Sequence, residues 1–402
     1  MIIRKRHSSL ERWQLALYAL FVLWRVLNNS NYVFRFGMLL TLFSTGVKIA
    51  IVFLSLFAIV ATKKYKVNEL VTAVVLVVTS LAALLRNDYD VVFLTILMVV
   101  SMRRIDFRRI VTYTMYAQII GALLVVGGCF AGIIEDFTYT HQMTSGSQLA
   151  HTYGFTYYTT PAYLMLAIMM EWNYLHFDKV RLTKLVGWGL VQFAVYKVFS
   201  SRASFYMSLM YLALLLVFSA RRFQMKSWIW KVAAALGISA LLIVNIILVQ
   251  EYNKGNMLVI GLDALTSGRL FYASKAMALY GVRLLGGQIP MSGAYESTFG
   301  LSQEYFYLDS GYLYSLLCYG VLITVLLVLA YTVIFVDAAR KRNKSIYCWL
   351  LVFMVINLNN NMFVSLHYMP LLFLLPHALT EGTKHVKTRM RAGKQRRSGT
   401  NA

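Results

Sequence analysis

The sequence is poor in cysteine and lacks the short motifs that mark several classes of enzyme. Its three cysteines, Cys129, Cys318 and Cys348, lie in apolar segments, which predicts packing residues and not a disulfide framework or a metal site. No GxxxxGK(S/T), HExxH, paired CxxC or GxSxG motif occurs in the 402 residues. These absences argue against ATP hydrolysis, bound zinc and a serine nucleophile, so we expect no cofactor and no metal.

Charged residues are also scarce, at 14% of the chain against 59% hydrophobic residues. A soluble globular protein is nearer a quarter charged and half apolar. Apolar stretches long enough to cross a hydrocarbon core of roughly 30 Å recur from end to end. We therefore predict an all-α polytopic integral membrane protein, with a single transmembrane domain at 1–380 and a basic cytoplasmic tail at 381–402.

Hydropathy predicts about twelve transmembrane helices, of which the fourth and the last two are short, so that the count lies between ten and twelve. The first apolar run is not followed by a small-residue cleavage site, which predicts a retained helix. The expected spans are 12–30, 37–61, 68–86, 88–102, 110–134, 157–177, 182–199, 203–220, 228–250, 311–337, 345–360 and 362–380.

The formal net charge of +23 does not indicate a nucleic-acid partner, because the basic residues form short clusters between apolar segments. Every second connection is basic, which is the pattern of loops retained in the cytoplasm. We therefore expect both termini to be cytoplasmic. The basic clusters are Arg4–Arg6, Lys63–Lys66, Arg103–Arg109, Lys179–Lys184, Arg221–Lys231, Arg340–Lys344 and Lys384–Arg397.

Two connections on the outer side are unusually long, at 135–156 and 251–310. Loops of this length are usually functional or disordered. The second is rich in Leu, Tyr, Phe and Met, so we expect it to fold back on the bundle as short helices and to carry much of the chemistry.

Arg269 and Arg283 lie on one stretch of that loop, which reads as a helix capped near Ser267 and stopped by Gly286 and Gly287. In a continuous helix, fourteen residues separate the two arginines by about 21 Å. They then serve two different anionic or sugar sites, unless the helix breaks at Gly281. Binding to lipid headgroups is the alternative role.

Three further cations are candidates for binding a substrate. Arg202 and Lys197 lie at a short outer link, against the positive-inside trend, where a guanidinium suits a lipid-linked phosphate. Lys48 lies near the middle of the second expected span, and intramembrane charges commonly mark functional cavities. The run NLNNN at 357–361 reads as a polar break between two half-spans.

The acid or base of a reaction has several candidates. Asp309 stands out because it opens a transmembrane helix, either as a first-turn carboxylate favoured by the helix dipole or as a substrate-binding group. His151 titrates near neutral pH. The other outer candidates are Glu135, Asp136, His141, Glu251, Asp263, Glu296 and Glu304.

Several short motifs resemble those of the bacterial Wzy-type polysaccharide polymerases, in the superfamily that includes the O-antigen ligases. They are SRAS at 201–204, SGR at 267–269, LDSGYL at 308–313 followed by YGVL at 319–322, and HTYGFTYYTTPAY at 151–163. The resemblance implies transfer of whole oligosaccharide units on undecaprenyl pyrophosphate at the outer face of a bacterial cytoplasmic membrane. Implied partners are the lipid-linked oligosaccharides, a chain-length regulator and a flippase.

By this resemblance, Arg202 and Arg269 would bind the donor pyrophosphate or an acidic glycan, while Arg283 and Asp309 would shape the acceptor side. The catalytic candidates are Asp309, Arg269 and Arg202, and the substrate-binding candidates are Arg283, Lys197, His151, Glu304 and Lys48. O-antigen ligases carry a histidine in the long loop, and 251–310 contains none, which favours a polymerase. A transporter or flippase is the rival from another class, although such proteins usually have short loops and a charge-lined cavity.

Overall fold

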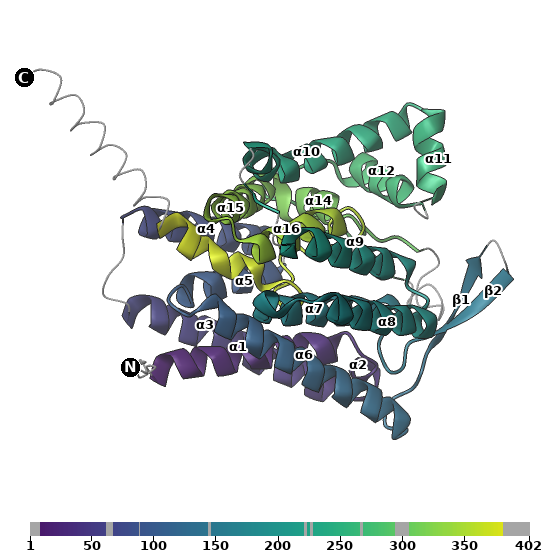
Figure 1. Cartoon of the computed structure of the whole chain (residues 1–402), viewed down its shortest axis with the longest axis horizontal. Helices are drawn as coiled ribbons and strands as arrows, with labels where there is room; N and C mark the ends of the chain where they lie inside the picture. The colour runs from purple at the N-terminus through teal and green to yellow at the C-terminus, as the bar shows by residue number, and fades with distance from the viewer. Residues whose placement is uncertain are drawn as a thin grey trace, which may run out of the picture.

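The computed structural model describes residues 9–61, 67–87, 89–143, 146–220, 223–225, 228–265, 268–293 and 305–380. They form a bundle of helices with one two-stranded hairpin (Figure 1). The longer helices are α1 Ser9–Asn28, α3 Gly37–Ala61, α4 Val67–Asn87, α5 Asp90–Ser101, α6 Phe107–Phe130, α7 Thr159–Leu175, α8 Leu182–Phe199, α9 Arg202–Ser219, α10 Trp228–Asn253, α12 Arg269–Tyr280, α15 Gly320–Lys341 and α16 Lys344–Ile356. The shorter elements are α2 Tyr32–Arg35, β1 Thr138–Met143, β2 Gly146–His151, η1 Phe177–Lys179, α11 Met257–Leu265, α14 Gly311–Tyr314, the π-helical η2 Ser315–Tyr319 and η3 Pro370–Leu374.

Six helices of the described part are long and apolar enough to cross a membrane. They are Gly37–Ala61, Glu69–Asn87, Phe107–Phe130, Arg202–Ser219, Trp228–Asn253 and the continuous run Gly311–Lys341. Large apolar side chains on α3 and α4 point away from the bundle, as expected of helices that face lipid. A largely helical membrane protein is therefore confirmed, and the count of about twelve spans stays a prediction.

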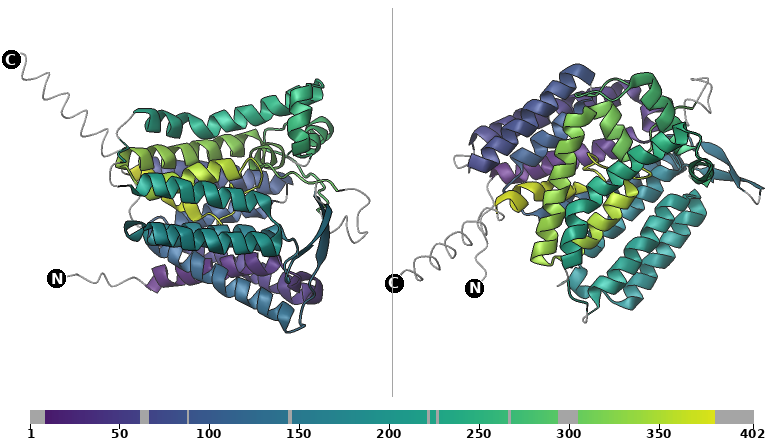
Figure 2. Two further views of the ribbon diagram at one scale, coloured as in Figure 1. Left: turned by 45° about the vertical axis from the view of Figure 1, so that its right-hand side comes forward. Right: turned by 90° about the horizontal axis from the view of Figure 1, so that it is seen from above.

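Part of the first long connection, 135–156, forms a β-hairpin. Strands β1 and β2 pair antiparallel with Thr138 opposite His151 and Met143 opposite Gly146. The hairpin extends beyond one end of the bundle, the end at which α11 and α12 also lie (Figure 2). We call this the hairpin end. The expectation of a purely α-helical chain missed this element, because a six-residue strand of polar residues carries little hydropathy signal.

The expected last helix at 362–380 is correct only for its second part, because residues 370–380 are helical and residues 362–369 are not. Helix α16 ends at Ile356, and the chain runs irregularly through 357–369 before η3. Asn357 fixes the turn, because its amide group donates to the carbonyl of Phe353 at 2.8 Å and its Oδ1 accepts from the amide of Met362 at 3.0 Å. A polar break after α16 is therefore confirmed, and its place between two half-spans stays a prediction.

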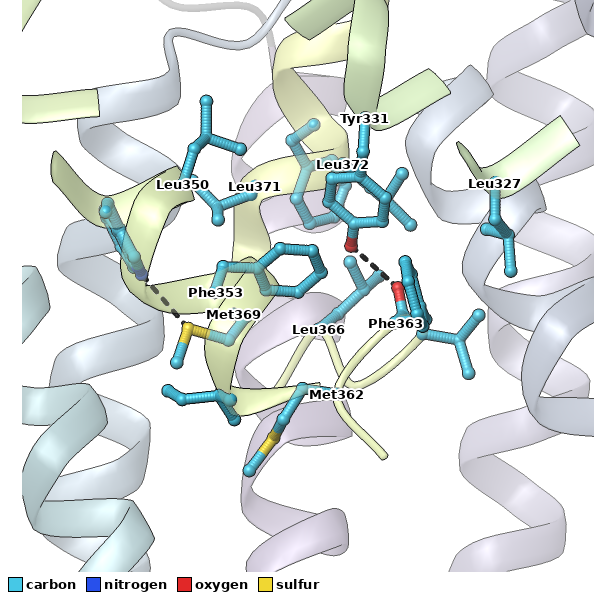
Figure 3. Packing of buried hydrophobic residues seen from close by; sticks show 14 of the residues in the cluster. Leu327, Tyr331, Leu350, Phe353, Met362, Phe363, Leu366, Met369, Leu371 and Leu372 are labelled. Carbon is cyan, nitrogen blue, oxygen red and sulfur yellow. Dashed lines mark hydrogen bonds between the residues drawn. The ribbon is translucent and has the colours of Figure 1, made fainter. Parts of the chain in front are cut away.

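Residues 362–369, which we call the irregular segment, are packed inside the bundle against α15 and α16 (Figure 3). Non-helical backbone is tolerated at membrane depth only where protein or water satisfies its polar groups. Here, side chains from four helices donate hydrogen bonds to four backbone carbonyls of the irregular segment. The bonds are Tyr331 to Phe363 O at 2.7 Å, Thr95 to Val364 O at 3.2 Å, Tyr18 to Leu366 O at 2.9 Å and Gln118 to His367 O at 2.6 Å.

The loop helix α12 is shorter than expected. It ends at Tyr280 because Gly281 adopts φ +65°, a left-handed conformation that favours glycine. The expected single helix from 267 through Arg283 is therefore wrong, and the break at Gly281 is correct. After the break, residues 283–287 pack so closely on η2 that a Cβ at Gly286 would overlap the carbonyl of Cys318. Asn87 holds this approach by donating to the carbonyls of Leu285 and Cys318 at 2.7 and 2.8 Å.

Candidate functional site

A charged cluster at the hairpin end joins three segments that are far apart in the sequence. The Nε of Arg269 donates to the Oδ2 of Asp309 at 3.1 Å, and its Nη1 donates to the Oδ1 of Asn359 at 3.0 Å. Arg269 opens α12, Asp309 precedes α14, and Asn359 belongs to the turn after α16. Side chains of Arg269 and Asp309 remain 28% and 29% exposed, so a ligand can reach both groups.

Asp309 is held in place by the start of the helix that follows it. The Ser310 hydroxyl lies 3.2 Å from the Oδ1 of Asn245 on α10 and 3.4 Å from the carbonyl of Asn357. The amide of Gly311 donates to the same carbonyl at 2.9 Å. Residue 311 must be small here, because a Cβ would overlap the Oδ1 of Asn357. The close contact between α14 and the 357–361 turn therefore brings Asp309 next to Asn359.

Arg269 is fixed by the cap of its own helix. Buried Asp263 accepts from the amide of Leu270 at 2.7 Å through its Oδ1, and its carbonyl accepts from Gly268, which has φ +76°. Helix α12 also packs on α10, where Ser274 hydrogen-bonds Asn253. The expected cap at Ser267 lies outside the described residues. The fixed start of α12 therefore holds the backbone from which the guanidinium of Arg269 extends.

Tyrosines surround the charged cluster. Tyr163 lies within electrostatic range of both Arg269 and Asp309. Tyr157 and Tyr305 lie near Asp309 in the same way, and burial raises the pKa of the Tyr305 phenol above the ordinary value. The Tyr305 hydroxyl therefore stays protonated and can donate hydrogen bonds at physiological pH.

Burial also raises the pKa of Asp309 above the ordinary value for a carboxyl, although the neighbouring Arg269 acts in the opposite direction. The loss of hydration thus outweighs the ion pair. A carboxylate whose affinity for a proton is increased in this way is suited to accept one from a hydroxyl group. The guanidinium beside it suits a phosphate or another anion.

Arg202 and Lys197 lie at the same end of the bundle but do not contact the charged cluster through any described bond. Arg202 is the exposed first residue of α9, after a turn in which Ser200 has φ +55°. Lys197 lies in the last turn of α8 with its Nζ 5.5 Å from the ring of Phe193. The ammonium therefore lies over an aromatic ring one turn earlier on its own helix, as in a cation–π contact.

His151 belongs to a second polar group at the base of the hairpin. Its Nδ1 lies 2.6 Å from the Oδ2 of Asp136, while the other oxygen of Asp136 accepts from the amides of Thr152 and Tyr153 at 3.0 and 2.7 Å. The imidazole is 46% exposed. An aspartate that orients a histidine is a common arrangement in acid–base sites, but no described contact joins this pair to Asp309.

Three other candidates lie elsewhere. Lys48 forms an ion pair with Asp90, with its Nζ 2.5 Å from the Oδ2. Arg283 follows the break at Gly281, and its carbonyl accepts from Val321 at 3.0 Å. Glu304 lies outside the described residues. Arg269 and Arg283 therefore do not lie on one continuous helix, as expected if the helix breaks at Gly281.

Sequence reasoning missed Asn359 and the tyrosines as members of the site. The NLNNN run was noticed as a break in an apolar span, yet a polar break at membrane depth is also a signal for a functional group. Two of the remaining candidate carboxylates have local roles, because Asp263 caps α12 and Glu251 pairs with Lys254 at 2.7 Å, while Glu296 lies outside the described residues.

Comparisons with known proteins leave the interpretation to the site itself. No family model matches the chain, and no curated protein or solved structure matches it. Any function must therefore be argued from the charged cluster, the helices that hold it and the short motifs of the sequence.

Proposed function

We propose that this chain is a glycosyltransferase-type polymerase that joins lipid-linked oligosaccharide repeat units into a surface polysaccharide, such as an O-antigen, capsule or exopolysaccharide. The donor is a growing chain on undecaprenyl pyrophosphate, and the acceptor is the non-reducing end of a new lipid-linked unit. The observation that carries the proposal is the cluster of Arg269, Asp309 and Asn359 at one end of a membrane bundle.

The reaction needs few groups, because the donor is already activated. A hydroxyl oxygen of the acceptor attacks the anomeric carbon of the donor, and the bond from that carbon to the pyrophosphate oxygen breaks. Asp309 receives the hydroxyl proton, and the pyrophosphate leaves with the bonding electron pair. Arg269 stabilises the negative charge on the departing group, which is a major source of catalysis when the donor is fixed in advance.

The other candidates take positioning roles in this proposal. Arg202 is at the same end of the bundle and provides a second cation for the pyrophosphate or an acidic glycan. His151, oriented by Asp136, contacts the acceptor sugars at the base of the hairpin. Arg283 and Glu304 belong to the long connection at 251–310 and would bind substrate. Lys197 lies near the lipid headgroups.

Under this proposal, the hairpin end of the protein lies outside the cell. About twelve spans, cytoplasmic termini and residence in a bacterial cytoplasmic membrane follow from the charge pattern and from the resemblance. Helices α11 and α12 support this placement, because they lie at the same end as the hairpin, away from the start of α1 (Figure 1). The partners are lipid-linked oligosaccharides, a chain-length regulator and a flippase.

The test is deletion of the gene in its host, followed by separation of lipid-linked and surface glycans on a gel. We expect single repeat units to persist and the long polymer to disappear. Complementation with wild-type chain should restore the polymer, Arg269→Gln should not, and Lys254→Gln is the matched control. Lys254 is an exposed cation near the same end, in a surface ion pair with Glu251. Full polymer with Arg269→Gln would refute the assignment of the site.

One observation favours a second candidate function, a lipid-linked oligosaccharide flippase or transporter. The pair of Lys48 and Asp90 places charge at the level of an apolar membrane helix, as in many transport pathways. On the same gel, repeat units trapped at the cytoplasmic face would support a flippase. Polymer retained on the lipid carrier would support a ligase instead.

A further inference from the structure

A second group of charges lies around the ring of Trp24. The Cζ of Arg25, in the last turn of α1, is 5.6 Å from the centre of this ring, and the Nζ of Lys48 is 5.5 Å from it. Lys48 belongs to α3, which packs against both α1 and α5, and Asp90 at the start of α5 pairs with it. The group thus contains two cations and one carboxylate around one indole.

Several polar atoms of this region are buried and have no hydrogen-bond partner among the described residues. They are the Nε1 of Trp24, the Nε of Arg25 and the Nε2 of His367. Trp24 and His367 are only 3% and 2% exposed, and Arg25 lies within electrostatic range of His367 and Tyr368. Buried polar groups are nearly always paired, so this concentration indicates a place where a polar ligand binds.

The ion pair of Lys48 and Asp90 is the accessible part of this group. Lys48 stands near the middle of the 25-residue α3, and the side chains of Lys48 and Asp90 are 36% and 33% exposed. The next residue of α3, Ile49, is 52% exposed, while Ile51, one turn along the helix, is fully buried, so Lys48 lies at the edge of the lipid-facing side of α3. An exposed ion pair among lipid-facing apolar side chains is costly unless it meets a polar partner in the membrane.

We infer that Trp24, Arg25 and Lys48 form a binding site for the phosphate group of a membrane lipid, reached from the side between α1 and α3. With Asp90 the group carries a net charge of +1, which favours an anion. The guanidinium, the ammonium and the indole N–H are all donors, as a phosphate requires. This site lies in different helices from the charged cluster, and its test does not depend on the proposed polymerase activity.

A purely structural ion pair explains less of the arrangement. Lys48 and Asp90 could neutralise one another inside the membrane, but this pairing leaves Arg25 and the indole N–H without a role. It also predicts that Asp90→Asn harms the protein. A phosphate site predicts instead that Asp90→Asn strengthens phosphate binding, because removal of the carboxylate frees Lys48 and raises the positive charge of the group.

The test is binding of a long-chain polyprenyl phosphate to the purified full-length protein in detergent, measured by native mass spectrometry and by displacement of a fluorescent analogue. Arg25→Gln and Lys48→Met should each weaken binding at least tenfold. Asp90→Asn should strengthen it about threefold, and Arg35→Gln, an exposed cation of α2 near the same end of α1, should leave it unchanged. Thermal unfolding of each variant controls for loss of fold.

Three results would overturn the inference. One is binding of the lipid by Arg25→Gln and Lys48→Met as tightly as by the wild-type protein. Another is weaker binding by a folded Asp90→Asn variant, which would indicate a structural pair. A third is equally tight binding of inorganic pyrophosphate, which would show that the ligand is a free phosphate. If the host still makes polymer without the gene but lipid binding follows the expected order, the proposed function fails and this inference stands.

Discussion

Asp309→Asn tests both the electrostatics and the chemistry of the charged cluster. The substitution keeps the shape of the side chain and an oxygen that can accept from the Nε of Arg269, now 3.1 Å away. It removes the negative charge and the ability to take up a proton. Its effects on stability and on activity should therefore have opposite signs.

The stability effect follows from the raised pKa of Asp309, which burial causes despite Arg269. A carboxyl with a higher pKa in the folded than in the unfolded state binds its proton more readily when folded. Its ionised form therefore costs stability above the folded pKa, and this cost disappears as the pH falls through that value. Because 29% of the side chain is exposed, we expect Asp309→Asn to add at most about 1 kcal/mol near neutral pH.

Substitution of Arg269, the ion-pair partner, should change the stability in the opposite direction. Arg269→Gln leaves the charge of Asp309 without its cation, so the folded state should lose about 1–2 kcal/mol. Thermal unfolding in detergent across a pH series measures both changes. The gain from Asp309→Asn should shrink toward acidic pH. A loss of stability for Asp309→Asn at neutral pH would refute the conclusion that burial outweighs the ion pair.

Activity should fall in both variants. If Asp309 accepts the proton of the attacking hydroxyl, Asp309→Asn should slow polymer growth by about 10²–10⁴-fold. If it only orients Arg269, the loss should be about tenfold, which corresponds to about 1.4 kcal/mol. The assay is polymer formation from lipid-linked repeat units in proteoliposomes. In the wild-type protein the rate should decline as the pH falls through the raised pKa of Asp309, and a rate within threefold of wild type in Asp309→Asn would exclude a catalytic role.

Further predictions concern the residues that support the site. Asn359→Leu removes the second acceptor of Arg269 and should reduce polymer formation about tenfold, with little change in expression. Tyr331→Phe leaves a carbonyl of the irregular segment without its donor, and should lower the unfolding free energy by about 1 kcal/mol in thermal unfolding. Gly311→Ala introduces a Cβ into the contact with the 357–361 turn, so it should cost about 1–3 kcal/mol and reduce activity on the same assays; unchanged stability would show that the turn can move.

Much of the fold could be predicted, because the length and hydropathy of a membrane helix are local properties of the sequence. The expected spans 37–61 and 182–199 coincide with α3 and α8. The hairpin and the irregular segment could not be found in this way. The hairpin pairs two polar strands that carry little hydropathy signal, and the irregular segment depends on long-range hydrogen bonds, as between Gln118 and the carbonyl of residue 367.

The site could be predicted only in part. Arg269 and Asp309 were chosen separately, one as a cation on a loop helix and the other as a carboxylate before a helix, and their ion pair joins residues 40 positions apart. Asn359 lies 90 positions from Arg269, and its role depends on the turn that Asn357 holds. Lys48 was chosen as an intramembrane charge, but its partner Asp90 was not foreseen.

The irregular segment also constrains the order in which the chain can be assembled. Its carbonyls are satisfied by side chains of α1, α5, α6 and α15, so it cannot settle in lipid before these helices have come together. Biogenesis must therefore end with the insertion of residues 362–369 into a bundle that is already formed. A nascent chain released after α15 would leave four polar side chains facing an apolar interior, and such a truncated product should be a preferred substrate for membrane quality-control proteases.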